Sequence, residues 1–465
     1  MSVQVLPEGW ALANYADVYL SASNGTGGTQ NKEGVGIPVS RIETIANETI
    51  DYSRIGYLAE YDETKVEKHK LIAGDILFSH INSPIHLGKT AIYDDTLPLY
   101  HGINLLRIVV DRSVVSPNFF NAHCRYIRAL GLFSLNAQHA VNQSSLNQKK
   151  LGSFELPLPP LAEQQVIADK LDTLLAQVEN IKARLEHIPE ILKQFRQSVL
   201  VAAVSGKLTE EWRNTQVDNL TWKETTLGRV ILEGPQNGLY KPSSCYGSGV
   251  RIVRIDGFYD GELLDWDTLK QVEVDDSEFQ KWSLQPNDIL VNRVNSIEYL
   301  GKSALVRNVP EPTVFESNIM RFSLNLDIAN PEFISLFLCS SIGLEQLRKN
   351  AKLAVNQASI NQGDVKSCLL NLPIINEQIE IVRRVKELFA YLNLLEQQVQ
   401  SASDQVNYLT QSILAKAFRG ELTAEWREAN SELISGENSA EALLGRIKVE
   451  RELAKPATKR GRGKS

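Results

Sequence analysis

The chain has 465 residues, a hydrophobic fraction of 43%, a charged fraction of 23% and a formal net charge of −7 at pH 7. This composition fits a globular protein with two or more domains. No apolar run is long enough to span a bilayer and MSVQVLPEGW does not resemble a signal peptide, so we expect neither a membrane-spanning segment nor a secretory leader. The acidic balance disfavours a free-standing nucleic-acid binder, although it allows local basic faces. Four scattered cysteines without a CxxC pair predict neither a disulfide framework nor a zinc site, so we expect a cytoplasmic protein.

An internal repeat divides the sequence into two halves. Residues 140–148 read AVNQSSLNQ, and AVNQASINQ follows 214 residues later at 354–362. The match continues without a gap to KLTEEWR at 207–213 and ELTAEWR at 421–427. A unit of this length is too long for a solenoid repeat. The repeat therefore predicts two similar halves, each with a globular head followed by a long helix.

The first part of each half predicts an α+β head rather than a doubly wound sheet. Short β-rich runs such as DILF, TAIY and LLRIVV alternate with turn clusters, and helices are expected near 117–132 and 331–349. The heads align at Arg41 with Arg254, but His80 faces Arg293. Residues 21–35 and 232–248 do not align at all. A shared frame with different contact residues is expected of two heads that recognise different targets.

The second part of each half carries apolar residues in alternating steps of four and three. Such a pattern over more than four heptads is typical of a coiled coil, and two matched stripes most simply bury each other. The alternative is a pair of amphipathic helices inside one globule. The predicted seam consists of Ile167, Leu171, Leu174, Val178, Ile181 and Leu185 in the first helix and Ile381, Val385, Leu388, Leu392, Leu395 and Val399 in the second.

Both helices have similar predicted ends. Each begins after a proline-containing segment, LPLPPLAEQ at 156–164 and LNLPIINEQ at 370–378. The Glu-Gln pair in each segment is expected to place acidic charge at the positive end of the helix dipole. Gly206 and Gly420 stand where a C-terminal cap is expected.

No segment carries a convincing catalytic or metal-binding pattern. SPIHLGKT at 83–90 and SIEYLGKS at 296–303 lack the first glycine of a phosphate-binding loop. The polar residues of the heads instead suit DNA grooves, because Arg pairs with guanine, Asn or Gln with adenine, and Lys with phosphate. The candidate DNA contacts are Arg41, His80, Asn82, Lys89 and Gln143 in the first half and Arg254, Arg293, Asn295, Lys302 and Gln357 in the second. For the Gln/Asn-rich segments, a capped turn is the alternative.

The ordered, duplicated set of motifs resembles the specificity subunit of type I restriction-modification systems. It comprises the half-repeat, the GDIL/NDIL and LGK segments, the helix starts and the LTxEWR ends, and LISGENSAEALLGRIKVER at 433–451 is similar to the type IA branch. The resemblance implies two target-recognition domains, each reading half of an interrupted site in double-stranded DNA. They would be separated by an antiparallel two-helix coiled coil with pseudo-two-fold symmetry. The expected boundaries are 1–157, 158–206, 207–371, 372–420 and 421–465, the last being a C-terminal segment with a basic tail.

The resemblance also implies a prokaryotic, non-catalytic subunit that binds no cofactor itself. Two modification subunits would supply S-adenosylmethionine-dependent adenine methylation, and two restriction subunits would supply ATP- and Mg-dependent translocation and cleavage. Each apolar stripe of roughly 33 residues would be about 50 Å long, which predicts heads on the order of 12–15 base pairs apart. The rival hypotheses are an autonomous DNA-modifying enzyme and a coiled-coil adaptor whose heads bind proteins.

Overall fold

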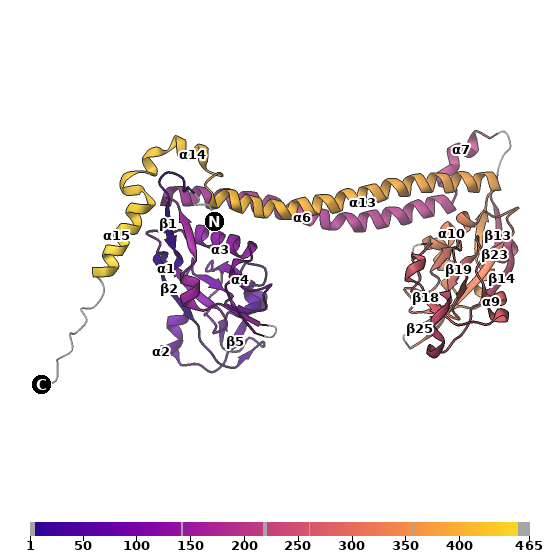
Figure 1. Cartoon of the computed structure of the whole chain (residues 1–465), viewed down its shortest axis with the longest axis horizontal. Helices are drawn as coiled ribbons and strands as arrows, with labels where there is room; N and C mark the ends of the chain where they lie inside the picture. Colours follow the sequence, from indigo (N-terminus) through magenta and orange to yellow (C-terminus); the bar gives the residue numbers. More distant parts are fainter. Residues whose placement is uncertain (1–4, 141–142, 217–220, 260, 356, 454–465) are drawn as a thin grey trace. The chain divides into compact units, whose positions relative to one another are not determined.

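The computed structural model describes residues 5–140, 143–216, 221–259, 261–355 and 357–453. The chain divides into two compact units, one containing residues up to Arg184 and from Ala402 onward, the other containing Leu185–Ser401. Each unit holds one head together with parts of two long helices, α6 (Leu161–Val204) and α13 (Ile375–Phe418) (Figure 1). Within the described ranges, none of the helices has the length and apolar character needed to cross a membrane.

The first head is built on a four-stranded antiparallel sheet in the order β2-β9-β6-β8. Its strands are β2 (Tyr19–Asn24), β9 (Leu106–Val110), β6 (Ile76–Phe78) and β8 (Thr90–Ile92). Three smaller sheets have the strand orders β1-β12, β10-β11-β7 and β3-β5-β4. Their strands are β1 (Ala11–Asn14), β12 (Glu155–Leu158), β10 (Gln138–Ala140), β11 (Gln143–Ser145), β7 (Ile81–Asn82), β3 (Gln30–Asn31), β5 (Gly56–Leu58) and β4 (Ile37–Val39). The helices are α1 (Tyr15–Val18), α2 (Glu63–Val66), α3 (Pro117–Ala129), α4 (Leu132–Leu135) and α5 (Gln148–Gly152), with 3₁₀ turns η1 (Ile42–Ile45), η2 (Tyr52–Arg54) and η3 (Glu67–His69).

The second head repeats the four-stranded order as β14-β23-β19-β21. Its strands are β14 (Ile231–Asn237), β23 (Ile319–Leu324), β19 (Ile289–Asn292) and β21 (Ser303–Leu305). The smaller sheets have the strand orders β13-β26, β20-β25-β24, β18-β15-β22 and β16-β17. Their strands are β13 (Lys223–Thr226), β26 (Leu369–Leu372), β20 (Val294–Asn295), β25 (Gln357–Ser359), β24 (Lys352–Ala354), β18 (Lys270–Val272), β15 (Tyr246–Val253), β22 (Thr313–Phe315), β16 (Phe258–Tyr259) and β17 (Glu262–Leu263). The helices are α8 (Leu227–Val230), α9 (Asp276–Trp282), α10 (Pro331–Cys339), α11 (Ser341–Arg348) and α12 (Gln362–Ser367), with η5 (Ser243–Cys245) and η6 (Trp266–Thr268).

Short elements follow each long helix. After α6 come η4 (Lys207–Thr209) and α7 (Glu210–Asn214), and after α13 come α14 (Ala424–Ala429), η7 (Ser431–Leu433), η8 (Gly436–Asn438) and α15 (Ala440–Leu453). Helix α15 packs on the first head, where Arg451 donates to the backbone carbonyls of Ala16 and Tyr19 at 3.0 and 3.1 Å. The expected basic tail, 455–465, lies outside the described residues.

The four-stranded sheets of the two heads match in strand order, and two of the smaller sheets correspond as well, β1-β12 with β13-β26 and β10-β11-β7 with β24-β25-β20, which confirms the predicted α+β class with two similar heads. The antiparallel pairing of Ile37–Val39 with Gly56–Leu58 has its counterpart in the pairing of Val250 to Ile252 with Lys270–Val272. Strand β15 also pairs in parallel with β22, and in the first head this contact is reduced to a bridge between Val39 and Tyr100. The frame therefore recurs even where the sequences have diverged.

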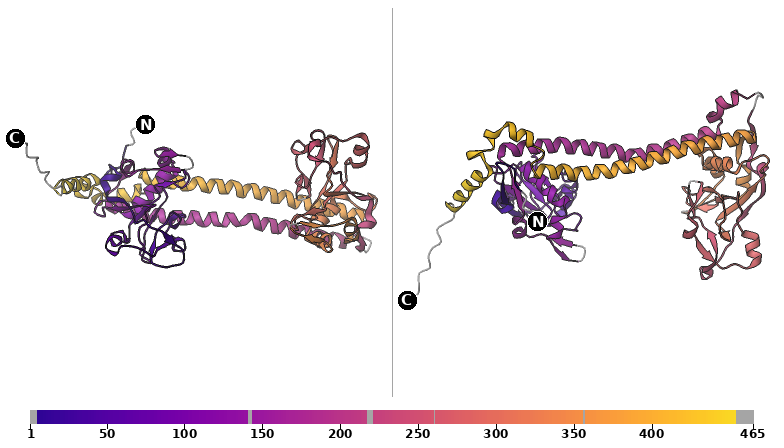
Figure 2. Two further views of the ribbon diagram at one scale, coloured as in Figure 1. Left: turned by 90° about the horizontal axis from the view of Figure 1, so that it is seen from below. Right: turned by 45° about the horizontal axis from the view of Figure 1, so that its top comes forward.

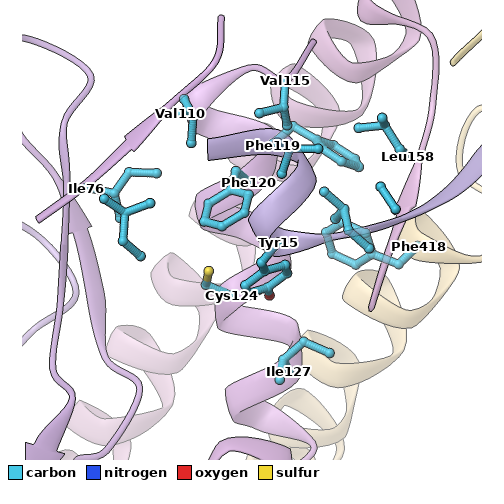
Figure 3. Packing of buried hydrophobic residues seen from close by; sticks show 14 of the residues in the cluster. Tyr15, Ile76, Val110, Val115, Phe119, Phe120, Cys124, Ile127, Leu158 and Phe418 are labelled. Atoms are coloured by element: carbon cyan, nitrogen blue, oxygen red, sulfur yellow. The ribbon is translucent and has the colours of Figure 1, made fainter. Parts of the chain in front are cut away.

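The first head packs directly on the end of α13. Phe418 lies beside Phe119 of α3 (Figure 3), with the two ring centroids 5.5 Å apart. Its ring centroid is also 4.7 Å from that of His123 on α3. Tyr15, Phe119 and Phe418 are all fully buried. Because residues of the head and of the helix end are buried against one another, the two share one core. Burying a side chain of this size stabilises a fold by about 1.5–3 kcal/mol.

The two long helices pack against each other within each unit. In the first unit, Ile167 and Leu171 near the start of α6 share an apolar cluster with Leu414 near the end of α13. In the second unit, Val199 and Ile381 share another cluster, which joins the end of α6 to the start of α13. Because start packs with end in both units, the paired portions run antiparallel (Figure 2).

The predicted seam is buried or half-buried at every position except one. Ile181 is 43% exposed, although its heptad position predicts burial. Leu409 of α13 is also 43% exposed. Helix α6 continues through Pro189. The 3.5-residue pattern thus gives the side of each helix that is covered, whereas the depth of burial varies along it.

Candidate nucleic-acid interface

A buried carboxylate joins three chain segments in the first unit. Glu163, in the first turn of α6, is 0% exposed. Its Oε2 accepts a hydrogen bond from Trp10 Nε1 at 2.8 Å, and its Oε1 accepts from Thr423 Oγ1 at 2.6 Å. Arg427 Nη2 forms an ion pair with the same Oε1 at 2.8 Å. The start of the head, the start of α6 and the segment after α13 are therefore held at one point.

The second unit repeats this junction with the same residue types from other positions in the chain. Glu377 Oε1 accepts from Trp222 Nε1 at 3.0 Å and from Thr209 Oγ1 at 2.8 Å, and it pairs with Arg213 Nη2 at 2.9 Å. All three groups converge on one oxygen. The other, Oε2, is buried without a hydrogen-bond partner among the described residues. The second junction is therefore less completely satisfied than the first.

The adjacent glutamines hold the heads to the helix starts. Gln164 Nε2 donates to the carbonyls of Val114 and Pro159, and its Oε1 accepts from Ser116 N at 2.8 Å. Gln378 repeats the pattern and accepts from Asn330 N at 2.7 Å. Both glutamines are fully buried. A buried amide whose donors and acceptor are satisfied fixes orientation, because rotation would leave polar groups unpaired.

These contacts add a second role to the Glu-Gln pairs. The carboxylates lie in the first turn of each helix, as expected, and they are also buried and paired with polar side chains from other segments. The LTxEWR motif supplies the pairing Thr and Arg, a role that sequence reasoning missed. The parallel duplication of Trp, Glu, Thr and Arg was the signal that could have found it.

Several candidate DNA contacts have internal structural roles. Asn82 Oδ1 accepts from Ser83 N, and Asn295 Oδ1 accepts from Ser296 N, each at 2.8 Å. These amides cap the turns that precede the two LGK segments.

An ion pair between residues outside the candidate set recurs in both heads. Arg107 and Asp75 form an ion pair of 2.6 Å with little exposure of either side chain. The corresponding ion pair in the second head joins Arg321 Nη1 and Asp288 Oδ2 at 3.4 Å.

The two LGK lysines also contact their own heads. Lys89 Nζ donates to the carbonyl of Ala46 at 2.5 Å, and burial, followed by the charge of Arg128, lowers the pKa of Lys89. The Lys302 ammonium lies 3.9 Å from the ring centroid of Tyr259 and 4.1 Å from that of Tyr299. Cation–π contacts of this geometry hold a lysine in place.

The residues that differ at aligned positions are partly enclosed. His80 is 7% exposed, lies 3.2 Å from the Asn24 amide through Nε2, and has a pKa lowered by burial. Arg293 Nη1 donates to the Ser317 carbonyl at 3.1 Å. Gln357 on β25 is exposed, whereas the side chain of Gln143 lies outside the described part of the structure.

The aligned arginines are the candidates placed in open clefts. Arg41 lines a cleft of about 540 Å³ in the first head, and its Nε pairs with Glu43 at 3.1 Å. Arg254 lines a cleft of about 450 Å³ in the second head, and its Nε pairs with Glu316 at 3.2 Å. Among the described residues, no group of His, Cys, Asp and Glu side chains is arranged to hold a metal ion.

Two α+β heads, each clamped to the start of one long helix and the end of another, define a modular scaffold protein. The model of the type I restriction modification DNA specificity domain matches residues 7–190 and 243–402. The chain belongs to this family, and it is the non-catalytic DNA specificity subunit of a type I restriction-modification enzyme.

Curated relatives support this assignment over nearly the whole chain. The chain is 37% identical to the EcoKI specificity subunit of Escherichia coli K12, with 97% of each chain covered. It is 38% identical to the StySPI specificity subunit of Salmonella potsdam, with 96% of each covered. The EcoBI specificity subunit of Escherichia coli is 43% identical over 69% of each chain.

Solved structures support the fold. A chain from a structure of type I restriction-modification complex assembly and conformational transition matches with a TM-score of 0.65 at 17% identity, covering 90% of this chain and 99% of that one. The HsdS subunit of Thermoanaerobacter tengcongensis matches with a TM-score of 0.57 at 18% identity, with the same coverage.

Proposed function

We propose that each head reads one half of an interrupted site in double-stranded DNA and that the paired helices set the unread spacer. The observation that carries this proposal is the pair of junctions at Glu163 and Glu377. Each ties a head to both helices through buried, directional contacts. A head fixed in this way cannot rotate freely about its helix, as a reader of a defined half-site requires.

Among the sequence candidates, we propose Arg41, Arg254 and Gln357 as DNA contacts. Each lines an open cleft or is exposed. His80 and Arg293 are proposed to contribute to the difference between the half-sites, because the two heads differ at this aligned position. Asn82, Asn295, Lys89 and Lys302 keep a DNA role only if their internal contacts exchange for contacts with DNA, and Gln143 remains a candidate from sequence alone.

We further propose that the helices dock two modification subunits and that two restriction subunits complete the complex. S-adenosylmethionine, ATP and Mg would then be bound by those partners. Exposed apolar side chains on the helices support docking, since large apolar groups on a surface mark protein contacts. In the second unit they include Ile191, Phe195, Tyr391 and Leu394, which are 59, 47, 59 and 50% exposed.

Mapping methylated adenines in host DNA tests the proposal. Cells with the modification subunits and this chain should carry methylation at one bipartite sequence, and cells without this chain should lack it. Replacing residues 221–372 with the second head of a relative should change one half-site and leave the other unchanged. A change in both half-sites, or methylation by this chain alone with S-adenosylmethionine, would contradict it. Unchanged methylation in cells lacking this chain would favour the adaptor hypothesis.

A further inference from the structure

The two clefts around Arg41 and Arg254 have the same chemical content. The first cleft is lined by the cations Lys32, Arg41 and Arg54, the carboxylate Glu43, and Tyr52 and Tyr57. The second cleft is lined by the cations Lys241, Arg254 and Lys270, the carboxylate Glu316, and Tyr240 and Tyr246. Three cations, one carboxylate and two tyrosines thus occur in both.

The charges are also paired in the same way. In the first cleft, Arg41 pairs with Glu43, and Arg54 pairs with Asp51 at 3.1 Å. In the second cleft, Arg254 pairs with Glu316, and Lys241 pairs with Glu278 at 2.6 Å. Within the ranges that the structure describes, the remaining lysines, Lys32 and Lys270, form no ion pair, and both are exposed. Each cleft therefore presents one uncompensated ammonium group.

Different parts of the chain produce this common content. The aligned arginines follow corresponding strands, β4 and β15. Lys270, however, pairs in β18 at the place that Gly56 takes in β5, whereas Lys32 follows β3 on the other side of β5. The carboxylates also differ in origin, because Glu43 lies two residues after its arginine and Glu316 follows β22. The shared feature is the chemistry of the cleft rather than an inherited set of residues.

We propose that the two clefts bind the DNA phosphate backbone and anchor each head on the duplex, rather than read bases. The half-sites of two divergent heads differ in sequence, but the phosphate backbone is the same in both. Lysine, arginine, tyrosine and serine side chains are typical donors to phosphate oxygens, and such contacts fix register without carrying sequence information. A shared chemistry in otherwise different heads therefore points to the shared part of the ligand.

The shape of the clefts agrees with this assignment. Base edges lie at the floor of a groove, and a protein reads them with an element that projects into it. The phosphate ridge of a duplex is convex and fits a concave, basic surface. In both clefts a carboxylate occupies the Nε edge of the arginine, which leaves the outer Nη groups to donate. This inference rests on the proposed function, since it needs both heads to contact DNA.

The test uses the complex of this chain with its modification subunits. Lys32→Ala and Lys270→Ala remove the uncompensated charges, and Lys223→Ala removes an exposed lysine outside both clefts. Binding is measured by fluorescence anisotropy, over a range of salt concentrations, to a duplex containing the mapped target and to a scrambled duplex. Methylation maps are recorded for the same variants.

We expect each cleft variant to weaken binding to both duplexes by the same factor and to leave the methylated sequence unchanged. One lost phosphate contact should reduce the slope of log K against log salt by about 0.9, so the factor separating wild type from variant should shrink about 3-fold between roughly 50 and 200 mM salt. Lys223→Ala should keep the wild-type slope.

Two results would overturn the phosphate assignment. One is relaxed sequence preference with unchanged binding to scrambled DNA, which would make these lysines base readers. The other is wild-type behaviour of both cleft variants in a complex that still discriminates its target. If the wild-type complex itself failed to prefer its target duplex, the proposed function would fail instead, so the two failures are distinguishable.

Discussion

Arg427 and Glu163 are 264 positions apart in the chain, yet the guanidinium of Arg427 forms an ion pair of 2.8 Å with the fully buried carboxylate of Glu163. The corresponding pair in the second unit, Arg213 and Glu377, is separated by 164 positions. Each half of the sequence therefore supplies the arginine that neutralises the helix start of the other half. The duplicated Glu and Arg residues thus form two equivalent ion pairs, each joining one half of the sequence to the other.

Glu163→Ala should destabilise the first unit by about 3–5 kcal/mol, because it leaves the largely buried Arg427 charge, the Trp10 indole N–H and Thr423 without their acceptor. Hydrogen exchange of peptides from each unit measures this locally. Glu377→Ala should have a smaller effect on the second unit, since one of its oxygens already lacks a partner among the described residues.

Glu421→Ala is the matched control for Glu163→Ala. Glu421 also pairs with an arginine near the end of α13, Arg419, but both side chains are about half exposed (50 and 47%). Exposed pairs of this kind contribute less than about 1 kcal/mol. Equal effects of the two substitutions would show that the junction has no special role.

Lengthening the helices should lengthen the DNA spacer. Seven residues inserted after Glu190 of α6 and after Gln400 of α13 add one heptad to each helix and keep the apolar stripes in phase. The added length of about 10 Å corresponds to about 3 base pairs, which methylation mapping would detect. An unchanged spacer in an active complex would reject the ruler. Insertion in α6 alone should abolish activity, because the two helices would then differ in length by one heptad and could not pair along their whole apolar stripes.

A circular permutant should remain active. The guanidinium of Arg427 lies over the ring of Trp10, just as the guanidinium of Arg213 lies over the ring of Trp222. In the second pair, residues 214–221 connect Arg213 to Trp222 along the chain. Joining Arg427 to Gly9 with a linker of similar length, and opening the chain between 217 and 220, should preserve both junctions. This permutant omits α15, so its stability also measures what that helix contributes. A second permutant opened inside α6, after Ala176, should fail to fold.

Mild acid should destabilise the first head before the second. Burial lowers the pKa of His101 to about 4 and that of His123 to about 3, whereas residues 188–465 contain no histidine. Because the folded first head favours the neutral imidazole, its stability is fully present above pH 6.5 and is lost as the pH falls toward 4. For His101 the loss at pH 5 should be about 2 kcal/mol.

Hydrogen exchange of the two heads at pH 7.5 and pH 5 measures this difference. His101→Phe is the informative variant, because the aligned residue of the second head is the buried Phe315. It should reduce the acid sensitivity of the first head, while His187→Phe on α6 should leave it unchanged. Equal acid sensitivity of the two heads would contradict the prediction.

The sequence by itself determined the duplication, the α+β heads and the covered side of each long helix. These follow from local chemistry, because an apolar period of 3.5 residues or a β-rich run between turns acts through near neighbours in the chain. It also contained the duplicated Trp, Glu, Thr and Arg, but it did not indicate that these residues contact one another.

Tertiary structure alone decided what the polar residues do. Lys89 and Lys302 occupy aligned positions, yet one donates to a carbonyl and the other lies between tyrosine rings. Lys32 and Lys270 do not align, yet both supply the uncompensated charge of a cleft. The partners of a polar group are set by segments far away in the chain, so their identity and burial emerge only when those segments pack.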